Sequence, residues 1–362
     1  MIKINKSTIL IAPLDWGLGH ATRCIPIIRT LKNAGYDIIV AVNEKQKILL
    51  SKELSNVKFL ELAGYNINYA KNPFLFALKI FIQVPKIIAS IKKENRWLSK
   101  IIEKENIDLV ISDNRFGLYT NKVPCVFITH QLTIKTPFTW LQNILQKINY
   151  KYINRFTQCW IPDVAGENNI AGILSHPNIY PKVVAHYIGV LSRFNKPVII
   201  EKKYDICVLL SGPEPQRTLL ENSLLNQLKK IENTNILFVR GLPQTKDVVQ
   251  AGTIQIENHL QQNELQTAIC NSEIIIARSG YTTVMELLSL QKKSILIATP
   301  GQTEQEYLAS HLHQQKKCLS YKQRNIDIVC AINTAKTFNF DLSNTLEFEA
   351  EKFLALTVNL MK

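Results

Sequence analysis

A repeated succession of strand, loop and helix constrains the fold of this chain more than any other feature. Residues 8–12 form a short β-branched run, and a glycine-containing loop at 15–20 separates it from an apolar helical pattern over about 21–34. Further strands are expected at 37–42, 57–60, 109–112 and 123–128. Short apolar runs joined in this way are typical of parallel strands that helices cover on both faces.

The same pattern begins again after a polar, proline-containing stretch at 194–203. A chain of 362 residues exceeds what one hydrophobic core usually serves. We therefore predict two Rossmann-like α/β domains at 1–193 and 194–345, with parallel sheets that face a cleft. A final helix is expected within 346–362, and packing back on the N-terminal domain is one arrangement open to it. The expected strands of the second half are 204–210, 236–240, 273–277 and 294–298, and the helices are 216–231, 265–268, 284–290 and 304–313.

The charge of the chain points to an anionic partner. The formal net charge is +14, with a pI near 9.3, which fits nucleic acid, anionic lipid or a phosphorylated small molecule. The sequence has no zinc-finger spacing, RNP-type aromatic motif or dense Lys/Arg run, so nucleic acid is not expected. Seven scattered cysteines without a CxxC pair indicate reduced thiols. We expect a cytoplasmic protein, with association at the inner face of the membrane left open.

The first glycine loop, Asp15–Arg23, reads DWGLGHATR. Ligands of parallel α/β sheets bind at the carboxyl ends of strands, so this loop is expected at the cleft together with 211–216 and 278–283. Gly17 and Gly19 permit close backbone approach, and a helix that starts here presents N–H groups to an anion. The helix dipole would lower the pKa of His20, which favours a neutral imidazole able to act as a base. The alternative is that His20 only caps the helix or bonds to the loop.

A second loop before a helix, Arg278–Glu286, reads RSGYTTVME. Its serine, glycine and threonines can offer N–H and hydroxyl donors to a diphosphate. Glu286 lies three residues after Thr283, which is capping-box spacing. Alternatively, its carboxylate could accept hydrogen bonds from ribose hydroxyls. A third such segment, Pro300–Ala309, reads PGQTEQEYLA, and its polar residues are expected either to face the cleft or only to cap a helix.

The succession of RSGYTTVMELL, a strand and TPGQTEQEYLA resembles glycosyltransferase family 28. Its best-known member adds N-acetylglucosamine to the lipid-linked peptidoglycan precursor. GLGHATR is similar to the family's N-terminal glycine loop, although it lacks the longer glycine run. Residues 188–194, IGVLSRF, resemble the segment before its C-terminal domain. His130–Thr133 keeps part of a His-Glu-Gln-Asn stretch, and the resemblance covers most of residues 8–315 in order.

This resemblance implies the GT-B fold, with an acceptor-binding N-terminal domain and a nucleotide-sugar-binding C-terminal domain. It also implies a UDP-sugar donor such as UDP-N-acetylglucosamine, inversion at C1, and no metal or other cofactor. His20 would be the general base, Glu286 would hold the ribose, and Glu304 and Gln305 would contact sugar hydroxyls. A lipid-linked or a glycan acceptor is open. The nucleotide-sugar-binding residues would be Gly17, Gly19, Arg193, Ser211, Gly212, Arg278, Ser279, Gly280, Thr282, Thr283, Glu286, Glu304 and Gln305.

Residues 74–102 mix phenylalanine, leucine and isoleucine with lysine and arginine. Such a composition fits an interfacial helix attracted to an anionic membrane. A core helix with a solvated basic face would have the same composition.

Three other functions are compatible with these motifs. GLGHATRC closely resembles a loop of the hydrolases of pseudaminic acid biosynthesis, where a histidine activates water, so a nucleotide-sugar hydrolase is the first alternative. An epimerase on the same scaffold and a non-catalytic, membrane-docked partner that binds a nucleotide-sugar are the others.

Overall fold

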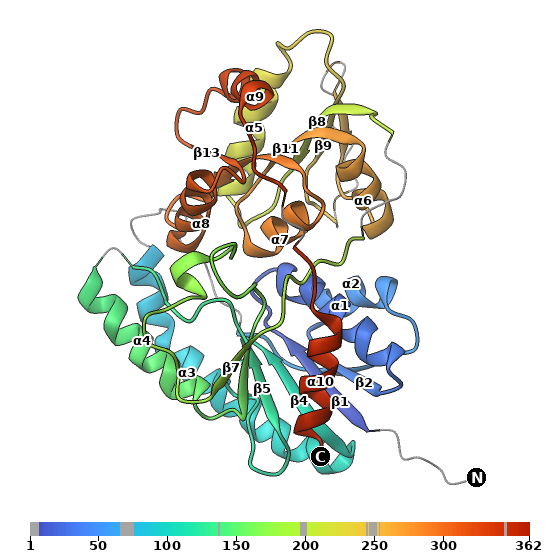
Figure 1. Cartoon of the computed structure of the whole chain (residues 1–362), viewed down its shortest axis with the longest axis vertical. Coiled ribbons are helices and arrows are strands. Elements are labelled where there is room, and N and C mark those ends of the chain that lie inside the picture. Colours follow the sequence, from blue (N-terminus) through green and yellow to red (C-terminus); the bar gives the residue numbers. More distant parts are fainter. Residues whose placement is uncertain are drawn as a thin grey trace. The chain divides into compact units, whose positions relative to one another are not determined.

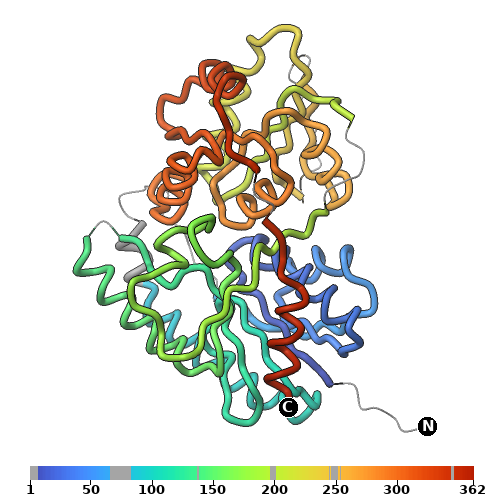
Figure 2. Tube along the Cα trace, viewed as in Figure 1, coloured from blue at the N-terminus to red at the C-terminus, as the bar shows by residue number. Residues whose placement is uncertain are grey.

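The computed structural model describes residues 7–65, 76–136, 138–195, 201–243, 245, 252, 254–343 and 346–362, without the side chains of 76–82. The described residues form two compact units. Unit 1 contains the residues up to 65 together with Ala77–Arg193 and Glu347–Lys362, and unit 2 contains Phe194–Leu346. Figure 2 lets the chain be followed by colour from one unit to the next and back.

Unit 1 is built on a seven-stranded parallel sheet in the order β3-β2-β1-β4-β5-β6-β7 (Figure 1). Its strands are β1 (Thr8–Pro13), β2 (Asp37–Val42), β3 (Lys58–Glu61), β4 (Ile107–Asp113), β5 (Cys125–Ile128), β6 (Gln158–Ile161) and β7 (Val184–Tyr187). Its helices are α1 (Gly19–Asn33), α2 (Glu44–Glu53), α3 (Phe76–Lys104), α4 (Thr139–Ile153), α10 (Ala350–Leu360) and the 3₁₀ turn Gly172–Leu174. The β-branched runs of β1 and β4 are buried, as expected for central parallel strands.

Unit 2 has a six-stranded parallel sheet in the order β10-β9-β8-β11-β12-β13. Its strands are β8 (Tyr204–Leu209), β9 (Ile236–Val239), β10 (Gln255–Glu257), β11 (Ser272–Ala277), β12 (Lys293–Ala298) and β13 (Leu319–Lys322). Its helices are α5 (Gln216–Leu228), α6 (Gln262–Cys270), α7 (Tyr281–Ser289), α8 (Thr303–Gln314) and α9 (Ile328–Thr337). A core of aliphatic side chains from strands and helices fills the unit.

Both sheets reverse their strand order at one point. In unit 1 the chain runs outward from β1 to β3 and then returns to β4 on the other side of β1, and β8 and β11 have the same relation in unit 2. The carboxyl ends of such a strand pair form the crevice in which open α/β sheets bind ligands. The loops after β1 and β4, and those after β8 and β11, are therefore the positions at which each unit is expected to hold functional groups.

The C-terminal helix α10 is part of unit 1. The ring of Phe353 is fully buried and lies 5.1 Å from that of Trp160 on β6. Phe348 forms an antiparallel bridge with Gly189. Gly189 has a φ of +79°, and a Cβ there would lie 2.3 Å from the carbonyl oxygen of Glu347, so only glycine fits this crossing.

The predicted α/β class with parallel sheets is confirmed. Helix α7 begins at Tyr281, three residues before the expected start, and α5 ends at Leu228, three residues before the expected end. Several further helices and short strands were not predicted. These are α2, α4, α9 and the short strands β6, β7, β10 and β13.

Candidate functional site

A buried carboxylate, Asp113, is the centre of the polar cluster in unit 1. It ends β4, directly opposite Pro13 at the end of β1. One carboxylate oxygen lies 2.9 Å from Nδ1 of His20, and Nε of Arg23 donates to both oxygens at 3.0 and 3.1 Å. Asp113 is fully buried and Arg23 is 2% exposed, whereas the side chain of His20 is 16% exposed. The cluster therefore presents only the histidine to solvent.

The charges of this cluster fix its protonation. Burial alone would raise the pKa of Asp113, but the Arg23 guanidinium, His20 and their hydrogen bonds outweigh it and lower that pKa to about 2. Burial is also the largest influence on His20, and together with the charge of Arg23 it lowers the pKa of the imidazole, against the opposing effect of Asp113. At neutral pH the cluster holds an ionised aspartate, an arginine cation and a neutral histidine.

The pairing also fixes the histidine tautomer. An ionised carboxylate can only accept hydrogen bonds, so Nδ1 of His20 carries the proton that it donates to Asp113. The lone pair is then on Nε2, which is the form that accepts a proton from a substrate. His20 is the second residue of α1, and its Nδ1 contacts a carboxylate of β4, outside its own helix and loop.

A second buried network supports the loop that follows Asp113. Arg115 is fully buried and donates to the carbonyl oxygen of Pro13 at 2.9 Å and to Glu94 of α3 at 2.9 Å. Glu94 also accepts from Tyr65 Oη at 2.9 Å. Burial raises the pKa of Glu94 to about 7, although Arg115 and the hydrogen bonds from Tyr65 and the loop lower it in part. This network joins the end of β1 to the loop after β4.

In unit 2, Arg278 follows β11 and is 1% exposed. Its Nη1 donates to the carbonyl oxygens of Ile297 and Ala298 at 3.3 and 3.1 Å, and its Nη2 donates to that of Gln216 at 2.8 Å. Arg278 thereby ties the end of β12 to the start of α5. Burial lowers its pKa to about 10, so it remains a cation at neutral pH. Across the described residues no carboxylate forms an ion pair with it.

Next to this cation lies the N-terminus of α7. Gly280 is its N-cap and has no side chain, and a Cβ at Gly280 would have no atom within 4 Å. Ser279 is fully buried and donates from Oγ to the carbonyl oxygen of Gln305 at 2.9 Å. A buried cation and a helix N-terminus with open space at its glycine N-cap form an environment suited to an anion.

Glu286 lies in the second turn of α7 and is 6% exposed. Because the helix starts at Tyr281, Thr283 is not its N-cap, and the capping-box alternative for Glu286 is wrong. Gln305 accepts from the N–H of Thr299 at 2.9 Å and donates to Gln302 at 2.6 Å. Both ends of the Gln305 amide therefore hold the loop before α8.

The other predicted residues lie in these same loops, in the first turns of the helices that follow them, or at the end of the middle segment of unit 1. Gly17 has a φ of +80° in the loop after β1, and Gly19 is the first residue of α1. Arg193 is the last residue of the middle segment of unit 1. The loop after β8 contains Ser211 and Gly212, the first turn of α7 contains Thr282 and Thr283, and the first turn of α8 contains Glu304.

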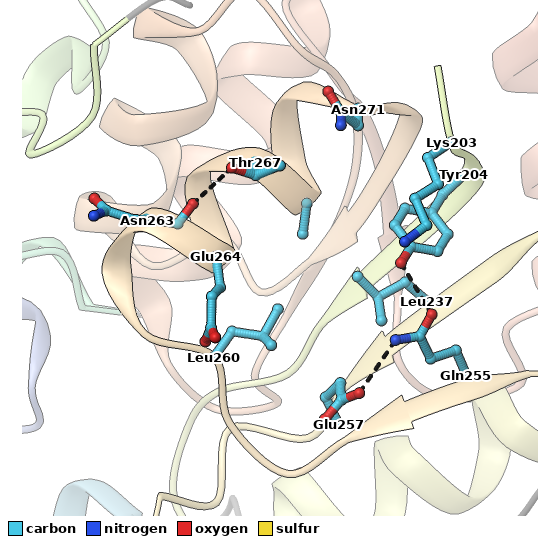
Figure 3. Close-up of a pocket in the computed structure, with 11 residues that line it drawn as sticks. Lys203, Tyr204, Leu237, Gln255, Glu257, Leu260, Asn263, Glu264, Thr267 and Asn271 are labelled. Atoms are coloured by element: carbon cyan, nitrogen blue, oxygen red, sulfur yellow. Dashed lines mark hydrogen bonds between the residues drawn. The ribbon is translucent and has the colours of Figure 1, made fainter. Parts of the chain in front are cut away.

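A separate pocket of about 410 Å³ lies in unit 2 between β8, β9, β10 and α6 (Figure 3). Its polar lining includes Lys203, Glu257 and Glu264, and Tyr204 donates to Gln255 at 2.9 Å. None of the predicted sugar-nucleotide residues lines it. It starts at the amino end of β8, away from the strand ends where ligands of such sheets bind.

Sequence reasoning did not identify Asp113 as the partner of His20. The two residues are 93 positions apart, so no local motif contains both. The available signal was topological, because an acidic residue that ends the strand next to β1 must lie at the same sheet edge as the loop after β1. Arg23 was within the recognised motif without an assigned role.

Comparisons with known proteins agree with this architecture. A model of the glycosyltransferase family 28 C-terminal domain matches residues 215–347. The UDP-N-acetylglucosamine--N-acetylmuramyl-(pentapeptide) pyrophosphoryl-undecaprenol N-acetylglucosamine transferase of Clostridium tetani is 25% identical over 289 residues, which cover 77% of this chain and 74% of the relative. The protein of the same name from Clostridium botulinum is 23% identical over 294 residues, or 77% and 75% of the two chains.

Solved structures share the fold. A spinosyn rhamnosyltransferase, SpnG, aligns with a TM-score of 0.65 and 11% identity over 97% of this chain and all of its own. MurG of Acinetobacter baumannii aligns with a TM-score of 0.54 and 14% identity over 92% and 90% of the two chains. The chain thus has the GT-B fold.

Residues 215–347 match the family 28 C-terminal domain, and the curated relatives are named as transferases, so the chain is a glycosyltransferase that is similar to family 28. The matches are to transferases, so they do not favour the hydrolase, the epimerase or the non-catalytic partner.

We predict that Asp113→Asn lowers the free energy of unfolding by about 3–5 kcal/mol at neutral pH, because it removes the buried carboxylate charge to which the Arg23 guanidinium donates. The folded-state pKa of about 2 lies below the ordinary value of 3.8. The ionised carboxylate therefore stabilises the fold above about pH 4, and this contribution of about 2 kcal/mol is lost as the pH falls towards about 2. Urea unfolding across this pH range should show that the difference in free energy of unfolding between wild type and variant becomes smaller as the pH falls. Asp37→Asn, at an exposed aspartate of unit 1, is the control, and a constant gap would contradict the prediction.

Proposed function

We propose that this glycosyltransferase transfers N-acetylglucosamine from UDP-N-acetylglucosamine to a hydroxyl of a lipid-linked acceptor, with inversion at C1 and without a divalent metal. The relatives support the choice of substrates, because their names specify this transfer and a pyrophosphoryl-undecaprenol acceptor. The observation that carries the proposal is the pairing of His20 with the buried Asp113, which leaves Nε2 of a neutral imidazole as a base.

In the proposed reaction the acceptor oxygen forms a bond to C1 of the sugar while the bond from C1 to the diphosphate oxygen breaks. Nε2 of His20 takes the proton of the acceptor hydroxyl. The imidazolium that forms is stabilised by the ionised Asp113, at 2.9 Å from Nδ1. Attack on the face opposite the leaving diphosphate inverts the configuration at C1.

The leaving diphosphate carries the negative charge that develops in the transition state, and fixed positive groups stabilise such charge best. Arg278 and the N-terminus of α7 are proposed to supply them. Support comes from the burial of Arg278 without a carboxylate among the described residues and from the open space at Gly280. Donor binding is thus assigned to unit 2, and the base to unit 1.

We expect His20→Ala to lower turnover by about 10²–10⁴-fold, the usual loss for a general base, with UDP affinity unchanged. The limb of the kcat/KM profile that reports the base should lie below pH 6.5, because the pKa of His20 is lowered from that value. UDP release measured with UDP-N-acetylglucosamine and a short-chain polyprenyl acceptor tests both points. His186→Ala, in β7, is the matched control. Loss of UDP binding together with turnover would contradict the proposed role of His20.

The ribose of the donor is assigned to Glu286. A carboxylate can accept from both ribose hydroxyls, and burial at 6% exposure keeps competing water away. Glu286→Ala should weaken UDP binding by about 1.5–3 kcal/mol in calorimetry, the value of a hydrogen bond to a charged group. Glu264→Ala in α6 serves as a control. An unchanged affinity with a lower melting temperature would mean that Glu286 only stabilises the helix.

A lipid-linked acceptor requires contact with a membrane, and α4 offers an exposed apolar face for it. Trp140, Ile144 and Ile148 are 64%, 47% and 48% exposed, and their spacing of four residues aligns them on one side of the helix. Phe138 is 58% exposed and stacks on Trp140. Exposed lysines, Lys147 and Lys151, lie on the same helix. No described helix is long and apolar enough to span a bilayer.

Part of the predicted docking segment 74–102 lies outside the described residues, and its described part is in α3. Val84 and Ile88 are each 39% exposed, and Lys86, Lys92 and Lys93 are exposed on the same helix. Helices α3 and α4 meet in one small cluster, to which they contribute Ile87 and Tyr152 among others. Their apolar and basic groups, together with a net charge of +14, favour an anionic bilayer as the partner.

We predict that the protein sediments with anionic vesicles at low salt and less at high salt, because exposed charges are screened beyond about 8 Å at physiological ionic strength. Replacing Trp140 and Ile144 by Ser, or Lys86, Lys92 and Lys93 by Gln, should reduce this binding without changing turnover of a soluble acceptor analogue. Ile48→Ser, at a 51% exposed residue of α2, should have no effect. If the wild-type protein does not sediment with anionic vesicles at low salt, the proposed membrane role of both helices is contradicted.

A further inference from the structure

Thr299 follows β12, and its side chain has an unusual environment. The residue is 2% exposed, and its Oγ1 has no hydrogen-bond partner among the residues that the structure describes. Its backbone is fully engaged, since its N–H donates to Gln305 at 2.9 Å and its carbonyl oxygen accepts from Gln302 at 3.0 Å. A buried hydroxyl without a partner costs about 1–3 kcal/mol, so the conformation of the loop alone does not explain it.

The hydroxyl lies beside the loop that follows β8. A Cβ built on Gly212 would lie 3.7 Å from Oγ1 of Thr299 and within 4 Å of nothing else. Gly212 is exposed and has a φ of +106°, a conformation that favours glycine. The absence of a side chain thus leaves room on the solvent side of the threonine hydroxyl, and any larger residue would fill it.

The same structure ties Thr299 to the anion-binding features of unit 2. Arg278 donates to the carbonyl oxygen of Ala298, the residue before Thr299, and to that of Gln216 at the start of α5. Its own Nε is buried and, among the described groups, has no partner. The same hydrogen-bonded network thus contains two donors without partners, Nε of Arg278 and Oγ1 of Thr299. Within the described chain this network includes no carboxylate that would balance the charge of Arg278.

We propose that Thr299 is a ligand of the donor diphosphate, with its hydroxyl donating a hydrogen bond to a phosphate oxygen that binds over Gly212. This inference rests on the proposed function and assigns to that site a residue outside the glycine turn and helix that follow β11. The bound oxyanion supplies the acceptor that Oγ1 lacks in the free protein. The bond is made to phosphate, so it contributes equally for any nucleoside diphosphate and for pyrophosphate.

Calorimetry with UDP, uridine and inorganic pyrophosphate on Thr299→Val and Thr299→Ser tests the proposal. Valine keeps the shape of threonine without its hydroxyl, so UDP and pyrophosphate should bind about 10- to 100-fold more weakly, the value of a hydrogen bond to a charged group. Binding of uridine, which has no phosphate, should not change. Serine retains the hydroxyl and should restore UDP affinity to within about threefold.

The melting temperature of the free protein is the second measurement. Thr299→Val removes an unpartnered buried hydroxyl, so the melting temperature of the free protein should stay unchanged or rise. The increase in melting temperature that UDP causes should be smaller in this variant than in the wild type. Equal affinity of wild type and Thr299→Val for UDP would overturn the role of Thr299 and leave the proposed function intact. A lower melting temperature with equal weakening of UDP and uridine would make Thr299 a structural residue. A wild type that binds no nucleoside diphosphate would instead overturn the proposed function, and this inference with it.

Discussion

Parallel strands that extend in both directions from one central strand leave the carboxyl end of that strand uncovered, because their crossover helices diverge to opposite faces. In unit 1 this strand is β1, with β2 and β4 on its two sides, and in unit 2 it is β8, with β9 and β11. His20 at the start of α1 and Asp113 at the end of β4 lie at the first position, and Gly212 and Arg278 come from the two loops at the second. The location of the functional groups in each unit thus follows from strand order.

The buried charge at the first position has partners of opposite charge, whereas the buried charge at the second is bonded only to backbone carbonyl oxygens in the described residues. Asp113 is fully buried and is compensated within the protein by Arg23 and His20, which keeps it ionised and makes it a fixed orienting group. Arg278 is equally buried, but only backbone carbonyl oxygens contact its Nη atoms in the described part of unit 2. An isolated buried cation is costly. A compensated charge is suited to holding a base, and an uncompensated one is suited to receiving an anionic substrate.

Local sequence patterns predicted the α/β class, the loops after β1, β8 and β11, and the motif residues His20 and Arg278. They could not predict the partner of His20, because Asp113 is 93 residues away and only the order of the strands brings the two together. Nor could they distinguish whether Arg278 contacts ligand directly or fixes the carbonyl of Gln216. The strands β6, β7, β10 and β13 have four residues or fewer. A run this short is too brief for an alternation of apolar and polar residues to be recognised in the sequence.

Helix α3 shows why composition alone left two interpretations of residues 74–102 open. Its buried face contains Ile91, Leu98 and Glu94, and Glu94 bonds to Arg115 in the loop after Asp113. Its other face exposes Val84, Ile88 and several lysines. The described part of the helix is therefore both a core helix and a basic, partly apolar surface. Because Glu94 needs Arg115 to offset its burial, the position of α3 and the conformation of the loop that follows Asp113 depend on each other.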